Sequence, residues 1–345
     1  MERYQRQTVL PEIGRAGQEK VASARVLVIG CGGLGGPVAA YLAGAGVGEL
    51  TLVDGDRVAT SNLHRQVFFA SGTEEHKAIA LRDHCVGLNP EITVKAVPEF
   101  VDGKNLKALL EAADLVVECT DDANLKHRVA DGCYLLRKPL VYAAVHKYEG
   151  YLAVFPHRDE SAIHLRDCFP APDPSLPDCA TVGVLPTAVG LVALLQANAA
   201  LCYLLGIGDP PVDQLLTYNA LDNSQHRLGL RKTYTETITP PWATARPTRA
   251  ELETEASRAD FPTYDGVFSM LDEQREPELE AGVVRLTKRN PLGQCLERME
   301  DGGRYLIYCN SGKLSLMLAA QVRKARPGVE ALSWRGGLVG EQPAK

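Results

Sequence analysis

The chain has 345 residues, of which 45% are hydrophobic, a formal net charge of −6 and nine cysteines. This length exceeds one ordinary hydrophobic core and predicts two domains. The acidic balance argues against a basic nucleic-acid surface, and the polar residues 1–11 give no sign of a signal peptide. An odd number of dispersed cysteines favours reduced thiols, so we expect a cytoplasmic enzyme that binds neither nucleic acid nor membrane.

Short strand-like runs alternate with helical stretches over residues 25–145. This alternation predicts an α/β fold with a mainly parallel sheet and helices on both faces. We expect strands near 25–29, 49–53, 92–97, 114–119 and 139–145, and helices near 37–45, 74–88, 104–112 and 124–136.

The alternation of strands and helices ends after a further predicted strand at 151–155. Residues 156–186 contain six prolines and two cysteines, and we expect a long crossover loop, a feature that is usually functional in compact domains. Residues 188–205 carry no charge and reach the length of a membrane span. Because Gln196 and Asn198 interrupt the run, we predict a buried helix instead.

The last third of the chain predicts an extension of the sheet and a second domain. Strands near 215–219 and 226–230 would extend the sheet in antiparallel fashion. We expect a first domain over residues 1–236, a linker over 237–248, and a small α/β domain over 249–345.

A glycine-rich turn follows the first predicted strand. Gly30, Gly32 and Gly35 form G-x-G-x-x-G before a helix, which is the layout of a Rossmann-like nucleotide-binding βαβ unit. These glycines, with Gly33 in the same turn, let the backbone approach phosphate at a helix N-terminus. Asp54 ends the next strand about 20 residues further on, where an acid would hold a ribose hydroxyl.

Polar and basic groups beyond the glycines distinguish this site from that of a dehydrogenase. Asp56 is a second acid, and Ser61–Gln66 (SNLHRQ) follows it. Hydride transfer needs no cation on the phosphates. Attack on the α-phosphate of ATP does, because negative charge develops there and on the departing pyrophosphate. Arg65 and Lys77 would supply that charge, and Asp121 would hold Mg²⁺ at the end of an apolar strand.

Five segments in a fixed order carry a family resemblance: RYQRQ, GCGGLG, LVDGDRV, SNLHRQ and ECTDD. Over roughly residues 1–232 the chain resembles the MoeB/ThiF family. These adenylyltransferases activate ubiquitin-like sulfur-carrier proteins and are related to ubiquitin-activating enzymes. The resemblance implies these roles: Asp54 binds the ribose, Asn62 and Arg65 contact phosphates, Lys77 steadies the triphosphate and Asp121 binds the metal.

The resemblance also implies a reaction and its partners. With ATP and Mg²⁺, the C-terminal Gly-Gly of a carrier protein would be converted to an acyl-adenylate, with release of pyrophosphate. Sulfur transfer would then give a thiocarboxylate, and a persulfide donor such as a cysteine desulfurase would supply the sulfur. Arg6 would reach the ATP site of a partner subunit, which implies at least a homodimer.

Two positions near Asp121 depart from the family pattern. Asp122 stands where the family usually has Asn, and Lys126 where it usually has Arg. Neither change removes a charge that the mechanism needs.

Many relatives also bind a structural zinc through two C-x-x-C pairs. Here Cys168 remains, but Leu165 replaces its partner and residues 233–239 contain no cysteine. One ligand cannot complete a tetrahedral site, so no zinc site is predicted and Cys168 is interpreted as a spare thiol.

Two other cysteines are candidates for sulfur chemistry. Cys179 lies in DCATVGVLP, which resembles the family's loop cysteine. That resemblance implies a covalent or redox role, the alternative being an ordinary loop thiol. Cys309 follows a strand-like run and opens a helical stretch, where backbone N–H groups and the helix dipole favour a thiolate or a bound persulfide.

The loop at Cys309 resembles the C-x-x-G-x-R-S loop of a rhodanese, and Trp334–Gly337 resembles that domain's closing motif. The match is degenerate, because Leu314 replaces the usual Arg, although Lys313 lies next to it. Residues 271–276 match the usual Asp-Val-Arg segment only loosely. We predict that Cys309 is a sulfur-carrying nucleophile, the alternative being a relic in a docking domain.

Three other functions stay open beside this interpretation. The chain could adenylate a peptide or a small carboxylic acid in specialised metabolism. A nicotinamide-dependent oxidoreductase is disfavoured by Asn62, Arg65 and Lys77. An inactive scaffold is disfavoured because the phosphate-binding set is intact.

Overall fold

The structure is a computed structural model, and it describes residues 2–72, 74–171, 183–242, 249–287, 289–310 and 312–340. The chain divides into two compact units, Met1–Thr244 and Ala245–Lys345. Each unit has its own sheet and its own hydrophobic core.

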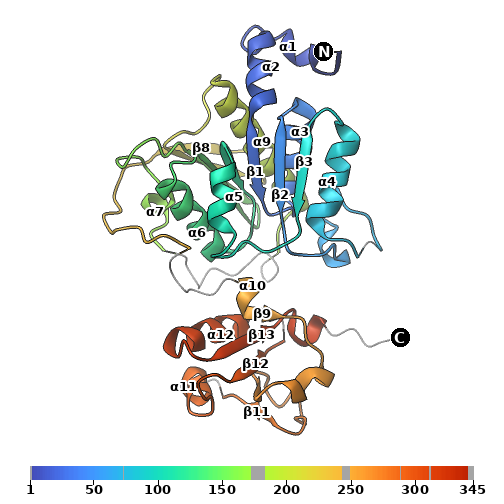
Figure 1. The fold of residues 1–345 in the computed structure, drawn as a ribbon, viewed down its shortest axis with the longest axis vertical. Coiled ribbons are helices and arrows are strands. Elements are labelled where there is room, and N and C mark those ends of the chain that lie inside the picture. The colour runs from blue at the N-terminus through green and yellow to red at the C-terminus, as the bar shows by residue number, and fades with distance from the viewer. Residues whose placement is uncertain are drawn as a thin grey trace. The chain divides into compact units, whose positions relative to one another are not determined.

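An eight-stranded sheet forms the centre of the first unit (Figure 1). Its strands are β1 Arg25–Ile29, β2 Glu49–Val53, β3 Thr93–Val97, β4 Leu115–Glu118, β5 Leu140–His146, β6 Glu149–Phe155, β7 Gln214–Asn219 and β8 Gln225–Gly229. Strands β3-β2-β1-β4-β5 lie in this order and are parallel, and β6, β7 and β8 continue the sheet in antiparallel fashion. The predicted Rossmann-like sheet with an antiparallel extension is confirmed.

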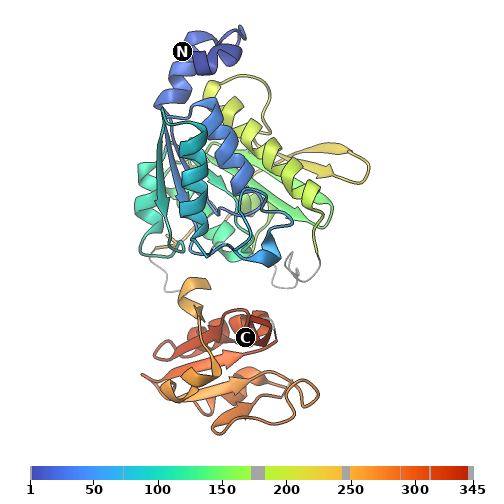
Figure 2. The same cartoon turned by 90° about the vertical axis from the view of Figure 1, so that its right-hand side faces the viewer.

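Helices cover both faces of this sheet (Figure 2). They are α1 Gln5–Thr8, α2 Gly14–Ser23, α3 Gly35–Ala45, α4 Lys77–Leu88, α5 Leu106–Ala112, α6 Ala123–Leu135, α7 Leu165–Cys168 and α9 Pro186–Leu205, with 3₁₀ turns η1 Glu2–Tyr4 and η2 Thr60–Asn62. On one face α3, α4 and α9 contribute Val38, Leu81 and Val192 to the core. On the other face α5 and α6 contribute Leu106 and Val129.

Helix α4 begins at Lys77, later than the predicted start at residue 74. The N–H of Val58 donates to the carbonyl of Glu75 (2.9 Å), so the chain is still extended there. The N–H of Lys77 then donates to the carbonyl of Asp56 (2.9 Å). This pairing places the first residue of α4 beside the loop that follows β2.

Helix α9 is the one helix among the described residues that is long and apolar enough to cross a membrane. Half of its most apolar window is buried. It packs against α3, β5 and β6, and it contributes Val192, Ala193 and Ala197 to the core. These contacts agree with the buried helix expected from the sequence.

The crossover segment after β6 contains a short helix, α7, that the sequence analysis did not predict. A capping box starts it. The His164 ring nitrogen Nδ1 accepts the N–H of Arg166 (2.9 Å), and the carboxylate of Asp167 accepts the N–H of His164 (3.0 Å). Cys179, further along the same segment, lies outside the described residues.

Helix α7 is tied to two distant parts of the unit. The Oδ1 atom of Asp167 accepts the N–H groups of Thr233 (2.6 Å) and Tyr234 (2.8 Å). Arg166 forms a bidentate ion pair with Asp131 of α6 (2.7 and 2.8 Å) and lies over the ring of Tyr234. We call the contacts of these five residues the α7 clasp.

The α7 clasp joins the two segments in which zinc-binding relatives would carry their cysteine pairs. Leu165 is buried in the apolar core, and Thr233 and Tyr234 offer backbone N–H groups, which are donors and cannot bind a cation. Within the described ranges, no three His, Cys, Asp or Glu side chains gather in a metal-binding group. The residues present do not fit zinc.

The second unit contains a five-stranded parallel sheet in the order β11-β10-β12-β13-β9. Its strands are β9 Glu253–Thr254, β10 Gly266–Ser269, β11 Val283–Arg285, β12 Arg304–Tyr308 and β13 Glu330–Trp334. Its helices are α10 Arg249–Leu252, α11 Pro291–Leu296 and α12 Lys313–Ala325, with 3₁₀ turns η3 Arg258–Thr263 and η4 Gly337–Gly340. This is the small α/β fold predicted for the C-terminal part.

The α7 clasp predicts that the stability of the fold depends on the ionised carboxylate of Asp167. It also predicts that a metal chelator leaves this stability unchanged. Burial alone would raise the pKa of Asp167, but hydrogen bonds from three backbone N–H groups outweigh burial and lower it below 3.8. The ionised carboxylate therefore stabilises the fold above about pH 4, and this contribution is lost as the pH falls further. We expect Asp167→Asn to cost about 2 kcal/mol, or roughly 4–8 °C in Tm at pH 7.

Differential scanning calorimetry with and without EDTA measures both effects. Asp159→Asn is the matched control, because Asp159 caps only its own turn at Ser161. A fall in the Tm of the purified protein on addition of EDTA, or an unchanged Tm in Asp167→Asn, would contradict the role of the clasp.

Candidate nucleotide-binding site

The glycine turn lies at the carboxyl ends of β1 and β4, which are neighbours in the sheet. The chain passes from β1 to β2 on the other side, so a crevice opens at this switch point. Gly30 has a φ of +92°, and a Cβ there would lie 2.9 Å from the carbonyl carbon of Cys119. A Cβ on Gly35 would overlap the carbonyl oxygen of Gly30. Only glycine allows the first turn of α3 to come this close to β1.

The segment Ser61–Gln66 crosses directly over the glycine turn. A Cβ on Gly33 would lie 3.3 Å from the carbonyl oxygen of Arg65, and one on Gly32 would lie 3.1 Å from Nε2 of Gln66. Within the segment, the Arg65 guanidinium donates to Oδ1 of Asn62 (3.0 Å). The predicted phosphate contacts Asn62 and Arg65 are thus brought to the N-terminus of α3.

Asp54 connects the end of β2 to the glycine turn. Its Oδ2 accepts the N–H of Cys31 (2.8 Å), and its Oδ1 accepts the N–H of Asp56 (2.8 Å). Burial raises the pKa of Asp54 above its usual value, and the nearby charge of Lys77 opposes this change. Asp54 therefore holds the backbone of the site in addition to its predicted role towards a ribose.

Lys77 is a buried cation between the acids of the site. Its side chain is 6% exposed, and its Nζ lies 3.1 Å from Oδ2 of Asp56. Burial alone would lower the pKa of Lys77, but the carboxylates of Asp54 and Asp56 outweigh it and raise the pKa above 10.5. Lys77 is therefore protonated at neutral pH, and its charge has a fixed position.

Asp121 and Asp122 follow β4 at the same edge of the sheet. Asp121 is exposed, and its charge contributes to the raised pKa of Lys77. The carboxylate of Asp122 caps α6 by accepting the N–H groups of Asn124 (2.8 Å) and Leu125 (3.2 Å). Of the two acids, Asp121 is the exposed one and Asp122 starts the helix.

Arg6 is not brought to this site within one chain. The hydroxyl of Tyr4 accepts from Asn89 (2.8 Å), and Gln7 donates to the carbonyl of Ala45 (3.1 Å). These contacts attach the N-terminal segment to the last turns of α3 and α4, and Figure 1 shows α1 and α2 beyond the amino ends of the strands. Helix α3 spans 11 residues, about 16 Å, and its first turn faces the site. Arg6 is therefore exposed at the opposite edge of the sheet.

Cys309 follows β12 in the second unit and is 3% exposed. The hydroxyl of Ser315 lies 3.4 Å from its Sγ, and the hydroxyls of Ser315 and Ser333 are 2.8 Å apart. A Cβ on Gly337 would overlap the carbonyl oxygen of Cys309, so the segment Trp334–Gly337 packs tightly against the cysteine loop. Leu314, at the position of the usual rhodanese arginine, is 58% exposed.

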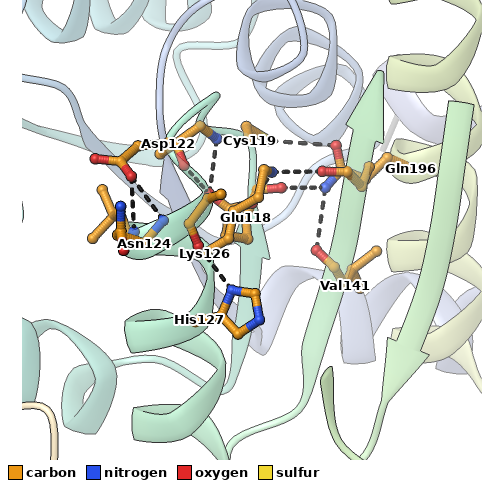
Figure 3. A network of polar contacts seen from close by, with 12 residues as sticks. Glu118, Cys119, Asp122, Asn124, Lys126, His127, Val141 and Gln196 are labelled. Atoms are coloured by element: carbon orange, nitrogen blue, oxygen red, sulfur yellow. Dashed lines mark hydrogen bonds and ion pairs between the residues drawn. The ribbon is translucent and has the colours of Figure 1, made fainter. Parts of the chain in front are cut away.

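Sequence reasoning missed several buried polar side chains near these sites. Glu118 ends β4, and Gln196 was seen only as an interruption of an apolar run. Both side chains are fully buried. Figure 3 shows their hydrogen bonds, together with Lys126. A charged residue at the end of an otherwise apolar strand was the available signal. Ser333, behind Cys309, had no comparable signal.

Residues 4–239 match the model of the ThiF family. The chain belongs to the ThiF family. Its motifs had predicted this relationship, and the match covers the whole glycine turn, Lys77 and Asp121. A sulfur carrier protein adenylyltransferase of Thermus thermophilus is 41% identical over 238 residues, which covers 67% of this chain and 88% of that protein.

The second unit is also matched among ThiF relatives. The adenylyltransferase/sulfurtransferase MoeZ of Mycobacterium tuberculosis is 32% identical over 359 aligned positions, covering 98% of this chain and 91% of MoeZ. The crystal structure of E. coli MccB with ATP has a TM-score of 0.57 at 20% identity, covering 64% of this chain and 67% of MccB. At this identity MccB shows the fold alone.

The ThiF site predicts that ATP affinity depends on Lys77. In Lys77→Met we expect ATP binding to weaken about 100-fold or more, because one desolvated cation opposite the phosphates is lost. Isothermal titration calorimetry measures this. Lys95→Met is the control, since Lys95 lies on the edge strand β3 and pairs with Glu49 on the surface. Equal affinities in the two variants would remove Lys77 from the binding site.

Proposed function

We propose that this protein uses ATP to adenylate the C-terminal glycine of a ubiquitin-like sulfur-carrier protein. The observation that carries the proposal is the charge arrangement over the glycine turn. There Lys77 is buried and protonated beside Asp56, and Arg65 and Asn62 lie on the segment that crosses the turn. The matched ThiF relatives are named as adenylyltransferases, and one is named for a sulfur carrier protein.

This arrangement suits attack of a carboxylate on the α-phosphate of ATP. The carboxylate forms a bond to phosphorus, the bond to pyrophosphate breaks, and an acyl-adenylate results. A carboxylate nucleophile is already ionised, so orientation and charge neutralisation matter more than a general base. The N-terminus of α3, Lys77 and Arg65 offset the charge that develops on the transferred phosphate and on the leaving pyrophosphate.

Asp121 fits the role of a ligand for Mg²⁺. Asp121 is exposed just after the carboxyl end of β4, where the backbone of Cys119 and Thr120 lies against Gly30 of the glycine turn. Carboxylate and phosphate oxygens are the ligands that Mg²⁺ prefers, and the ion would neutralise the phosphates of ATP.

Sulfur transfer is proposed as the second stage. A persulfide on Cys309 attacks the acyl-adenylate, AMP leaves, and an acyl disulfide forms. A thiol then attacks the sulfur of Cys309, which releases the thiocarboxylate and leaves a disulfide. Cys179 is our candidate for this thiol. A dithiol reductant would then reduce the disulfide to two thiols, and a persulfide donor such as a cysteine desulfurase would reload Cys309. The eight cysteines in the described part of the chain are free thiols, which suits a cytoplasmic enzyme.

A homodimer is proposed because Arg6 lies at the wrong edge of the sheet for its own site. In a dimer the N-terminal segment of one protomer would supply Arg6 to the phosphates bound by the other. A peptide or small-acid substrate is less well supported. The MccB structures share only the fold, whereas MoeZ matches both units.

ATP–pyrophosphate exchange tests the adenylation directly. We expect exchange that requires the small Gly-Gly-ending protein encoded nearest this gene, and we expect Asp121→Ala to abolish it. A carrier that lacks its last glycine is the substrate control. Cys309→Ser should keep the exchange and lose the thiocarboxylate product, detected by mass spectrometry. Exchange that responds to short peptides and ignores the carrier would support the alternative substrate.

Subunit mixing tests the role of Arg6. Arg6→Ala and Lys77→Ala proteins should each be inactive, but mixed dimers would contain one intact site. After random subunit exchange we expect about a quarter of the wild-type rate, because about half of the dimers are mixed. Lys77→Ala mixed with Asp121→Ala is the control and should stay inactive, since both residues act in one chain. A dimeric Arg6→Ala protein with full exchange activity would rule out this assignment.

A further inference from the structure

A buried carboxylate and a buried ammonium group lie behind the nucleotide site, at the end of β4. The Glu118 side chain has no exposed surface, and the Lys126 side chain is 8% exposed. The two form an ion pair, shown in Figure 3. Taking two charges out of water is expensive, and a buried pair often adds no stability over apolar residues. The pair therefore calls for a functional explanation.

Both members of the pair are fully engaged by neighbouring elements. The Lys126 ammonium, in the first turns of α6, also donates to the carbonyl of Ala143 on β5 (2.7 Å) and faces the ring of Tyr142. The Glu118 carboxylate accepts both the N–H (2.8 Å) and the hydroxyl of Thr120. Because the carboxylate bonds a residue of the following turn, the ion pair determines how the chain leaves β4.

A second buried side chain secures the same turn from the opposite face of the sheet. Nε2 of Gln196 on α9 donates to the carbonyls of Glu118 (2.8 Å) and Val141 (3.1 Å). The Cys119 thiol lies 3.4 Å from Oε1 of Gln196. Strand β4 is thus held to β5, α6 and α9 within the five residues that precede α6.

The turn from residue 119 to 122 carries one exposed acid. Cys119 and Thr120 are held by Gln196 and Glu118, and Asp122 caps α6. Asp121, between them, is exposed and directly follows Thr120, whose backbone nitrogen would lie 3.0 Å from a Cβ on Gly30. The backbone contacts on both sides of Asp121 restrict the directions in which its carboxylate can point.

We infer that Glu118 and Lys126 are positioning residues for adenylation: their ion pair holds the turn at 119–122 so that the Asp121 carboxylate faces the nucleotide site. The inference rests on the proposed function only in assigning Asp121 to that reaction. Lys in place of the family's usual Arg at position 126 suits this role, because its ammonium group reaches both the Glu118 carboxylate and the Ala143 carbonyl.

A double-mutant cycle between Lys126 and Asp121 tests the inference. Lys126→Met should lower kcat for ATP–pyrophosphate exchange by up to about 100-fold, the cost of displacing a catalytic group by about 1 Å. In an Asp121→Asn background the same change should have almost no further effect, because Lys126 acts through Asp121. Lys126→Arg should restore most of the rate. The affinity for ATP with Mg²⁺, measured by calorimetry, should show the same non-additivity and needs no carrier.

Controls separate positioning from general stability. Lys138→Met removes a lysine that donates to the carbonyls of Glu111 and Ala113, remote from the crevice, and its effect should add to that of Asp121→Asn. Glu118→Gln is a second variant of the ion pair. It keeps the size of the side chain, so it still tests the inference if Lys126→Met does not fold.

The outcomes distinguish this inference from the proposed function. Wild-type protein that exchanges no pyrophosphate with any Gly-Gly carrier would refute the proposed function, and the ATP-affinity cycle would still test the positioning. Additive effects of Lys126→Met and Asp121→Asn in both measurements would overturn the inference. An Asp121→Asn protein with unchanged activity and unchanged ATP affinity would overturn it as well.

Discussion

The close approach of the first turn of α3 to the end of β1 constrains every other part of the nucleotide site. A side chain on Gly35 would overlap the Gly30 carbonyl, so the helix can begin directly against the strand. The positive end of the α3 dipole then lies at the crevice between β1 and β4. Asp54 holds the turn from the side of β2, and Ser61–Gln66 crosses it from above. The cationic groups have defined positions because the glycine turn has only one accessible shape.

Several charged side chains of the site are buried, where water does not solvate them. Lys77 is buried against two acids, and Glu118 and Lys126 are buried against each other. Each of these charges has an opposite partner, and Glu118 and Lys126 also bond backbone groups, which offsets part of the cost of removing them from water. The first group faces the crevice, and the second lies behind the turn that carries Asp121. The charges around Lys77 thus belong to the nucleotide site, and the pair of Glu118 and Lys126 supports the backbone of the turn at 119–122.

Local patterns predicted the strands, the glycine turn and the family to which the chain belongs. Each predicted strand of the first unit lies within two residues of the observed one. Alternating apolar runs report burial directly, and G-x-G-x-x-G reports a backbone conformation. The late start of α4 could not be predicted, because it depends on pairing between Val58 and Glu75. The network of Glu118, Lys126 and Gln196 joins β4 and α6 to α9, where Gln196 lies 78 positions from Glu118, and no local pattern contains that contact. The same holds for Ser333 behind Cys309, which the fold of β13 brings to the cysteine loop.

The α7 clasp changes what the protein needs from its surroundings in order to fold. Carboxylate, guanidinium and backbone N–H groups of the chain itself make the connection between α7 and the segment at Thr233 and Tyr234. A structural zinc site would tie completion of this region to the supply of free metal ion, and competing chelators would then limit the amount of folded protein. Here the region can close as soon as the polypeptide is complete. The connection made by the α7 clasp would therefore not depend on the supply of zinc.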